Sequence, residues 1–183
     1  MELTAQDERI LSETFEMLRE CALGQVQVPV HRDYHSRNIM VLKDNSLGII
    51  DFQDAVLGPI TYDLVSLLKD CYISWPAEQV QAWVKQYFTM AKKAGLIGPI
   101  SEQQFILWFD WMGLQRHLKV AGIFARLSIR DGKHDYLNDI PLTLQYIMST
   151  AREYDALAEF HSWLQNRILP ELDFTLPTLA ESK

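Results

Sequence analysis

From about residue 60 onward, apolar residues recur at intervals of three and four positions, and this pattern continues to about residue 170. Such spacing gathers the apolar side chains on one face of an α-helix. It predicts helices over residues 61–73, 76–95 and 101–131, a further helix that begins at Asp139 and Pro141, and a last one from Thr150 to Pro170. Because these segments make up most of the chain, the sequence predicts a mainly α fold.

The first sixty residues differ, because they combine one helix with a short region of β-strand character. Thr4 and Asp7 have the spacing of a capping box, and the helical pattern after them ends at Gly24. Short apolar runs then occupy residues 26–30, 38–43 and 47–52, and a polar tripeptide separates the last two. The sequence therefore predicts a small β-hairpin inserted between helices, and not an alternating β/α sheet.

Composition indicates a folded globular protein. The chain has 183 residues, of which 48% are hydrophobic and 22% are charged, and these proportions are typical of ordered domains. We expect one domain over residues 1–170 and a loose tail over residues 171–183. Cys21 and Cys71 lie far apart and show no CxxC pattern, so both are predicted to be free thiols.

Charge and hydropathy argue against two classes of partner. Acidic residues outnumber basic residues by 24 to 17, which gives a net charge of -7, and no basic cluster offers a surface for nucleic-acid phosphates. No apolar run is long enough to span a bilayer. We therefore expect no nucleic-acid partner, no membrane association and a cytoplasmic location.

The side chains with reactive chemistry lie in the predicted hairpin region. Asp33 is followed five positions later by Asn38, and Asp51 stands near the end of the last predicted strand. A loop of this kind can place all three around a bound Mg²⁺ and a transferring phosphoryl group. Mg²⁺ prefers oxygen ligands and retains several waters, so Asn38 and Asp51 would be sufficient protein ligands. Asp33 is then left to accept the proton of an acceptor hydroxyl, and the pattern predicts phosphoryl transfer.

Two segments carry a resemblance to a known family. Residues 31–38 read H-R-D-Y-H-S-R-N and residues 50–52 read I-D-F, which is similar to the catalytic-loop and metal-loop signature of eukaryotic-like kinases. Gln53 replaces the glycine of that signature, and His35 stands where Ser/Thr kinases usually have lysine. The string G-P-I-T-Y-D-L at residues 58–64 follows too soon for a protein-kinase activation loop. The chain therefore resembles the aminoglycoside phosphotransferase and choline kinase family, whose acceptors are small molecules.

This resemblance implies a protein-kinase-like C-terminal lobe that uses ATP and Mg²⁺. It implies that Asp33 is the catalytic base, that Asn38 and Asp51 are the Mg²⁺ ligands, and that Asp63 braces the catalytic loop. Residues 31–38 and 114–127 look most like those of bacterial kinases that phosphorylate N-acetylmuramate or N-acetylglucosamine at the anomeric hydroxyl. The expected acceptor is thus a small molecule, an amino sugar of cell-wall recycling.

The amino-terminal ATP lobe of the family has no counterpart in this sequence. That lobe supplies a strand-borne lysine and a loop over the nucleotide, whereas the first lysine here is Lys43 and no G-x-G-x-x-G occurs. We expect the ATP lobe to be absent, and the chain to be a fragment, a truncated product or one part of a split enzyme. The missing lobe, or a second copy of the chain, is then an expected protein partner.

Several positions have a structural reading beside the functional one. His31 is expected to hold the backbone behind the metal loop, and His35 either reaches substrate or satisfies a loop carbonyl. Arg37 and Asp54 are further candidates for substrate binding, although an acidic residue beyond a strand is often simply solvated. Asp33, Asn38 and Asp51 themselves have a local reading, because such residues also serve as turn and cap residues.

The later helices and the remaining functional classes leave further alternatives. Arg116 and Lys119 share one helix face and either bind an acidic or sugar acceptor or form a solvated face. Trp108 and Trp111 repeat with other apolar positions, which favours a core role over a sugar platform. Besides a kinase, the sequence permits a non-catalytic binding or dimerisation module, and a metal-dependent hydrolase is the weakest of the three.

Overall fold

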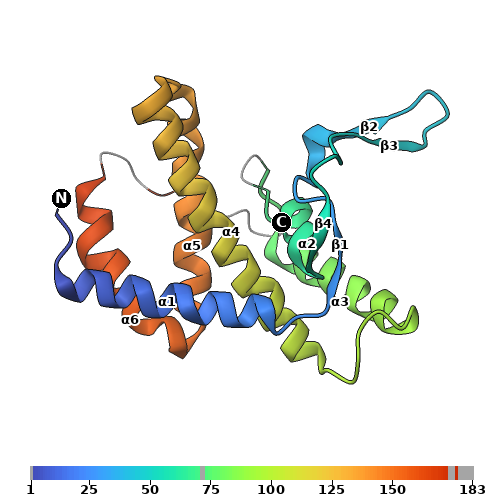
Figure 1. Cartoon of the computed structure of the whole chain (residues 1–183), viewed down its shortest axis with the longest axis horizontal. Helices are drawn as coiled ribbons and strands as arrows, with labels where there is room; N and C mark the ends of the chain where they lie inside the picture. The colour runs from blue at the N-terminus through green and yellow to red at the C-terminus, as the bar shows by residue number, and fades with distance from the viewer. Residues whose placement is uncertain (1, 71–72, 173–175, 177–183) are drawn as a thin grey trace. The chain divides into compact units, whose positions relative to one another are not determined.

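The computed structural model of the protein describes residues 2–70, 73–172 and 176 (Figure 1). Cys71 and most of the predicted tail lie outside these residues. The helices are α1 (Ala5–Leu23), α2 (Tyr62–Leu68), α3 (Ala77–Lys93), α4 (Glu102–Asp131), α5 (Ile140–Glu153) and α6 (Ala158–Trp163). The strands are β1 (Gln27–Val30), β2 (Ile39–Val41), β3 (Leu47–Ile49) and β4 (Val56–Pro59). Short turns of other helix types occupy Ser36–Asn38, His134–Asp139, Asp155–Leu157, Leu164–Ile168 and Leu169–Glu171.

The mainly α prediction is confirmed, and the elements form two compact units. Among the described residues, one unit contains residues 22–113 and the other contains residues 2–21 and 114–172. Both units include part of α4. No described helix has the length and the apolar character that are needed to cross a membrane.

The unit of residues 22–113 contains two separate antiparallel pairs of strands. The pair β2 and β3 forms the predicted hairpin, which extends away from the helices of its unit (Figure 1). The pair β1 and β4 joins the segment before the hairpin to the segment after it. A side chain at Gly58 would come within 2.7 Å of Val30 Cγ2, so this close approach of the strands requires glycine.

Helices α2, α3 and the first half of α4 provide the apolar core of the same unit. Buried side chains there include Val65, Val84, Phe88, Phe105 and Trp108. Two buried polar side chains, Gln25 and Thr61, bond to each other, with Thr61 Oγ1 donating to Gln25 Oε1 over 2.7 Å. Gln25 Nε2 also donates to the carbonyl of Trp108, so the start of α2 is tied to α4.

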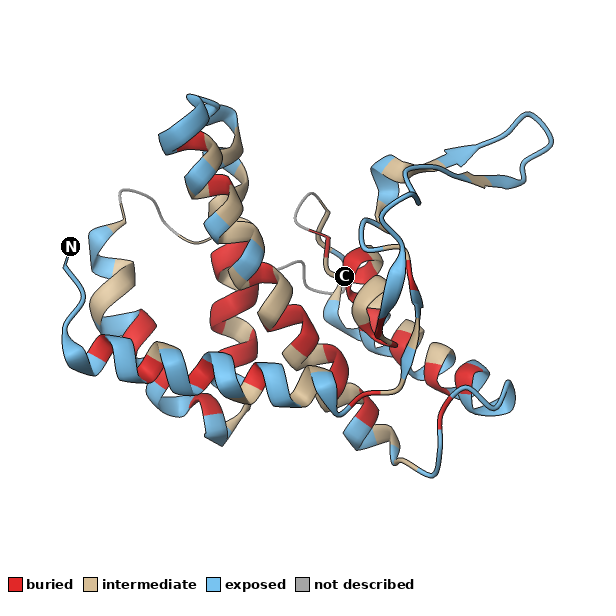
Figure 2. Ribbon diagram, in the orientation of Figure 1, coloured by how far each residue is buried: buried red, intermediate tan, exposed pale blue. Residues whose placement is uncertain are grey.

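The other unit is built from helices that pack along one another. α5 lies beside the second half of α4 (Figure 1), and the rings of His117 and Tyr146 stack between them at 4.7 Å. Figure 2 colours the buried positions of α4 and α5 red, and these positions recur along both helices. Fully buried apolar side chains here include Leu114, Ile147, Leu157 and Phe160.

Two predicted helix boundaries are wrong, and one strand was missed. α2 ends at Leu68 and not at Ile73, because Lys69 leaves helical geometry with φ -120° and ψ 47°. α5 continues to Glu153 instead of giving way to a new helix at Thr150, and the extended backbone of Tyr154 ends it. β4 was not predicted, since Val56–Pro59 is short and contains glycine and proline.

The capping box at the start of α1 is confirmed and joins a buried polar cluster. The backbone N–H of Thr4 donates to Asp7 Oδ2 over 2.8 Å, and Trp163 Nε1 donates to Asp7 Oδ1 over 2.7 Å. Arg167 also donates to the carboxylate, over 3.1 Å. These bonds, led by that from the Thr4 backbone, hold the pKa of Asp7 well below its ordinary value despite burial.

We predict that Asp7→Ala lowers the melting temperature at pH 7 by about 5–10 °C, because it leaves the buried indole N–H of Trp163 without its acceptor and removes the carboxylate partner of Arg167. The depressed pKa means that the stabilisation is complete above the unfolded value of about 4 and declines as pH falls below it. The difference in melting temperature between Asp7→Ala and the unsubstituted chain should therefore be smaller at pH 3 than at pH 7. Glu8→Ala, at the exposed neighbouring position, is the control, and an equal loss in both variants would contradict the assignment.

Cys21 is the free thiol in the part of the chain that the structure describes, as predicted. Burial raises the pKa of this thiol to about 11, so the group remains protonated and unreactive at neutral pH.

Candidate active site

The first residue of the site is Asp63, in the opening turn of α2. Its carboxylate accepts two backbone N–H groups, from His31 over 2.6 Å and from Arg32 over 3.0 Å. Arg32 has a φ of 78°, which is the left-handed region that non-glycine residues rarely adopt. The two charge-assisted hydrogen bonds stabilise this conformation, so α2 fixes the start of the loop that carries Asp33.

Two further hydrogen bonds join this loop to the segment that carries Asp51. The ring Nε2 of His31 lies 2.9 Å from the carbonyl oxygen of Ile50, and the N–H of Ile50 donates to the carbonyl of Asn38 over 3.1 Å. Because a carbonyl only accepts, Nε2 of His31 carries the proton in this arrangement. The residues before Asp51 are thus held against both ends of the loop.

The loop also bonds to itself around the carbonyl of Asp33. That oxygen accepts the N–H of His35 over 3.1 Å and the side-chain Nδ2 of Asn38 over 2.9 Å. The N–H of Asn38 in turn donates to the carbonyl of His35 over 2.9 Å. Since the NH₂ group of Asn38 donates within the loop, the amide oxygen is the atom of this side chain that could serve as a metal ligand.

Asp51 directly follows the strand region and has a φ of 67°. One carboxylate oxygen, Oδ1, accepts the side-chain Nε2 of Gln53 over 2.6 Å, which leaves Oδ2 for another partner. Asp33 and Asp51 are exposed and Asn38 is half-buried, so water and phosphate can reach all three. The available ligand atoms are carboxylate and amide oxygens, and because Mg²⁺ prefers oxygen ligands, these residues fit Mg²⁺.

The hydrolase alternative finds no support in this geometry. Among the described residues, no three His, Cys, Asp or Glu side chains are grouped so as to hold a metal ion. His31, Asp33 and Asp51 therefore do not form the three-ligand site that such a hydrolase needs.

The remaining predicted residues are distributed over both units. His35 is half-buried, and Arg37 and Asp54 are exposed, all within the unit that contains Asp33. Arg116 is half-buried and Lys119 is exposed, and both belong to the part of α4 in the other unit. The structure thus links Asp33, Asn38, Asp51, His31 and Asp63 through hydrogen bonds made by these residues and their backbone neighbours, whereas Arg116 and Lys119 belong to the other unit.

Two contacts of the site were missed from the sequence. Gln53 donates a hydrogen bond to Asp51, and because the two residues form a D-x-Q sequence, this contact could have been predicted from their spacing. Ser36 Oγ donates to Asp70 Oδ2 over 3.3 Å, and no pattern in the sequence joins residues so far apart.

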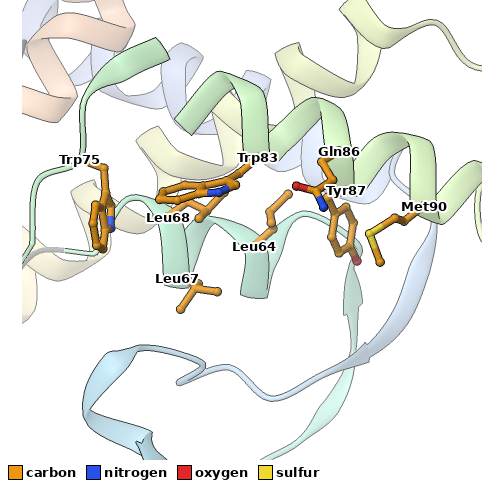
Figure 3. Close-up of a pocket in the computed structure, with 8 residues that line it drawn as sticks. All are labelled: Leu64, Leu67, Leu68, Trp75, Trp83, Gln86, Tyr87 and Met90. Carbon is orange, nitrogen blue, oxygen red and sulfur yellow. The ribbon is translucent and has the colours of Figure 1, made fainter. Parts of the chain in front are cut away.

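A cavity of about 460 Å³ lies between α2 and α3 in the same unit (Figure 3). The side chains that line it are Leu64, Leu67, Leu68, Trp75, Trp83, Gln86, Tyr87 and Met90. Burial raises the pKa of Tyr87, and the charge of Asp63 adds to the shift. None of the predicted catalytic or metal-binding side chains lines this cavity, so its chemistry is that of an apolar pocket.

The chain matches known proteins over most of its described length. Residues 2–96 match the family model described as the APH phosphotransferase enzyme family. An N-acetylmuramate/N-acetylglucosamine kinase of Neisseria meningitidis is 47% identical over 163 residues, which is 89% of this chain and 48% of that protein. A protein of the same name from Pseudomonas aeruginosa is 44% identical over 167 residues, covering 91% of this chain and 46% of that protein.

The chain therefore spans about half the length of the curated relatives that it matches. The family match includes the loop from His31 to Asn38, the Asp51 segment and Asp63. On this match, and with a mainly helical fold that carries small antiparallel sheets, the chain belongs to the APH phosphotransferase enzyme family.

Proposed function

We propose that this chain is the catalytic part of a kinase that transfers the γ-phosphate of ATP to a hydroxyl of an amino sugar. The observation that carries the proposal is the set of hydrogen bonds that holds the Asp33 loop and the Asp51 segment together. Asp63 fixes residues 31 and 32, while His31 and Asn38 bond to Ile50 beside Asp51. Phosphoryl transfer depends on such positioning, because the protein contributes mainly geometry and charge.

The roles of the three side chains follow from their atoms. Asp33 accepts the proton of the acceptor hydroxyl or orients that hydroxyl toward the γ-phosphate. Asn38 and Asp51 would hold Mg²⁺ through an amide and a carboxylate oxygen. A bound Mg²⁺ supplies positive charge that offsets the negative charge of the nucleotide phosphates. Asp63 keeps the loop in its strained conformation throughout.

The amino sugar is proposed from the names of the relatives. Three of the proteins that match are named as kinases of N-acetylmuramate and N-acetylglucosamine, and they are 44–47% identical to this chain over the matched residues. We propose the same acceptors here, with His35, Arg37, Asp54, Arg116 and Lys119 as candidates for contact with the acceptor or its phosphate. We place the reaction in the cytoplasm, where ATP is available.

ATP contacts are proposed to come largely from polypeptide outside this chain. Each relative is about twice as long as the segment that matches. No glycine-rich nucleotide loop occurs in the printed sequence, and its first lysine is Lys43. A complementary ATP-binding lobe, in the same or another polypeptide, is therefore part of the proposal.

The test is a complementation assay. The chain and the unmatched part of the Neisseria relative would be purified separately and mixed with γ-labelled ATP, Mg²⁺ and either N-acetylmuramate or N-acetylglucosamine. We expect labelled sugar phosphate when both polypeptides and Mg²⁺ are present, and little or none when one is omitted. No transfer to either sugar, with both polypeptides folded, would contradict the proposed function.

A second candidate, a non-catalytic binding or dimerisation module, is favoured by one observation. Many of the exposed large apolar side chains fall between residues 40 and 57, in and around the hairpin: Met40, Val41, Leu42, Leu47, Ile49, Ile50, Phe52, Val56 and Leu57. An isolated two-stranded hairpin is only marginally stable in water, and an apolar surface of this kind favours association. Light scattering distinguishes the two: a concentration-dependent dimer supports the module, and a monomer that gains activity with the ATP lobe supports the kinase.

A further inference from the structure

Helix α2 carries an acidic residue near each end, and both contact the catalytic loop. Asp63, in its first turn, accepts the backbone N–H groups of His31 and Arg32. Asp70, two residues beyond its last residue Leu68, accepts the hydroxyl of Ser36 over 3.3 Å. The seven residues of α2 extend about 10 Å, and a loop of five residues can bridge such a distance. The helix therefore contacts the loop on both sides of Asp33.

Asp70 is buried, which is unusual for a carboxylate and indicates a specific structural contact. Only 6% of its surface is exposed, and a carboxylate is rarely buried unless it is paired or hydrogen-bonded. Its neighbour Lys69 anchors the end of the helix, because Lys69 Nζ lies 2.8 Å from Asp110 Oδ1 and both side chains are 14% exposed. The same ammonium group lies 4.9 Å from the centre of the Phe109 ring. Asp70 is thus presented to Ser36 from a fixed backbone.

The Ser36 contact is linked through the turn to both Asn38 and Asp33. Ser36 begins the 3₁₀ turn Ser36–Asn38, so a shift of Ser36 moves the backbone of Asn38. Asn38 Nδ2 donates to the carbonyl of Asp33, which couples the two residues directly. The hydroxyl of Ser36 therefore holds the turn that sets the amide oxygen of Asn38 and the backbone of Asp33.

We propose that Asp70 is a positioning residue that, through Ser36, holds the catalytic loop in the geometry needed for phosphoryl transfer. The proposal rests on the proposed function for its reaction, but the contact itself can be tested without turnover. Asp63 fixes the first half of the loop and Asp70 fixes the second. Without the Ser36 contact, the position of Asn38 beside Asp51 would depend more heavily on the hydrogen bond from the N–H of Ile50 to the carbonyl of Asn38.

Hydrogen exchange measured by mass spectrometry tests the contact in the intact chain. Ser36→Ala is expected to speed exchange of amides 33–38 by about five- to tenfold, which is within the range for loss of one ordinary hydrogen bond. Its urea midpoint should fall only slightly, because one hydrogen bond is a small part of the stability of a chain of this size. Ser46→Ala is the matched control, since Ser46 is an exposed serine that donates to Asp44 over 2.7 Å in the hairpin turn. It should leave amides 33–38 unchanged.

The Asp70 variants complete the design. Asp70→Ala should speed exchange of the same amides at least as much as Ser36→Ala does. Asp70→Asn should restore much of the protection, because the asparagine amide can still bond to the hydroxyl of Ser36. Adding Ser36→Ala to Asp70→Ala should then change exchange of amides 33–38 little further. Unchanged exchange in Ser36→Ala, or equal exchange in Ser36→Ala and Ser46→Ala, overturns the proposal.

Turnover in the complementation assay separates this proposal from the proposed function. Ser36→Ala should lower kcat by about tenfold, because the variant disturbs the catalytic loop. It should change the KM for the sugar by less than about twofold, because the contacts to the sugar are retained. An unchanged kcat would overturn the positioning role. If the unsubstituted protein shows no turnover, the proposed function fails, and the exchange data alone decide whether Asp70 holds the loop.

Discussion

The Asp33→Asn variant is expected to lose about a thousandfold in kcat in the complementation assay, within the range that a positioned general base contributes. Asparagine has the same shape as aspartate but cannot accept the proton of the acceptor hydroxyl. The Asp33 carbonyl, which bonds to His35 and Asn38, is retained in the variant. The loss should therefore fall on the chemical step, and single-turnover kinetics with both sugars would measure it.

The control for this variant is Asp44→Asn, the same change at another exposed aspartate of the same unit. Asp44 lies in the hairpin turn, where it bonds to Ser46. Asp44→Asn should keep nearly full activity, and both variants should unfold at similar urea concentrations. A kcat for Asp33→Asn within about threefold of the unsubstituted protein would contradict the role of Asp33 as base.

The Asp51→Asn variant is expected to raise the Mg²⁺ concentration for half-maximal activity by at least about tenfold, because it removes the charged oxygen ligand of the site. The φ of 67° at this position is tolerated by asparagine as well as by aspartate, so the backbone should not change. Activity measured across a Mg²⁺ titration, at saturating ATP, gives the shift directly.

Asp44→Asn again serves as the control, because it removes a carboxylate outside the site. The two substitutions thus separate a specific ligand from a general loss of negative charge. A Mg²⁺ dependence of Asp51→Asn that equals that of Asp44→Asn would exclude Asp51 as a metal ligand.

The helical part of the fold was predictable because its signals are local. The capping residues Thr4 and Ser101 begin α1 and α4 as expected, with Ser101 Oγ accepting the N–H of Gln104 over 3.1 Å. Gly95, at φ 71°, closes α3 where the sequence placed its end. The same local logic located the β2 and β3 hairpin around the polar turn at residues 44–46.

The parts that were not predictable depend on contacts between distant residues. β4 forms only because β1, about thirty residues earlier, pairs with it, and its own sequence has little strand character. α2 stops at Leu68 although its apolar pattern continues, and the residues that follow bond to Ser36 and Asp110 instead.

The site also combines local features that the sequence predicts with contacts between distant residues that it does not predict. The residue types and spacing of Asp33, Asn38 and Asp51 were visible in the sequence, since they occupy two short segments. The hydrogen bonds that organise them were not, because they join His31 to Ile50, Arg32 to Asp63 and Ser36 to Asp70. A motif gives the reacting groups, whereas the buried and backbone partners that fix their geometry require the fold.

The measurement closest to the central claim is paramagnetic broadening of backbone amides by Mn²⁺, an oxygen-binding substitute for Mg²⁺. In a spectrum of the ¹⁵N-labelled chain, Mn²⁺ at low millimolar concentration or below should selectively broaden the amides around Asp33, Asn38 and Asp51. Asp51→Asn should remove that broadening, and excess Mg²⁺ should reverse it. Broadening centred on other acidic residues, or unaffected by Asp51→Asn, would show that these three side chains do not share a divalent ion.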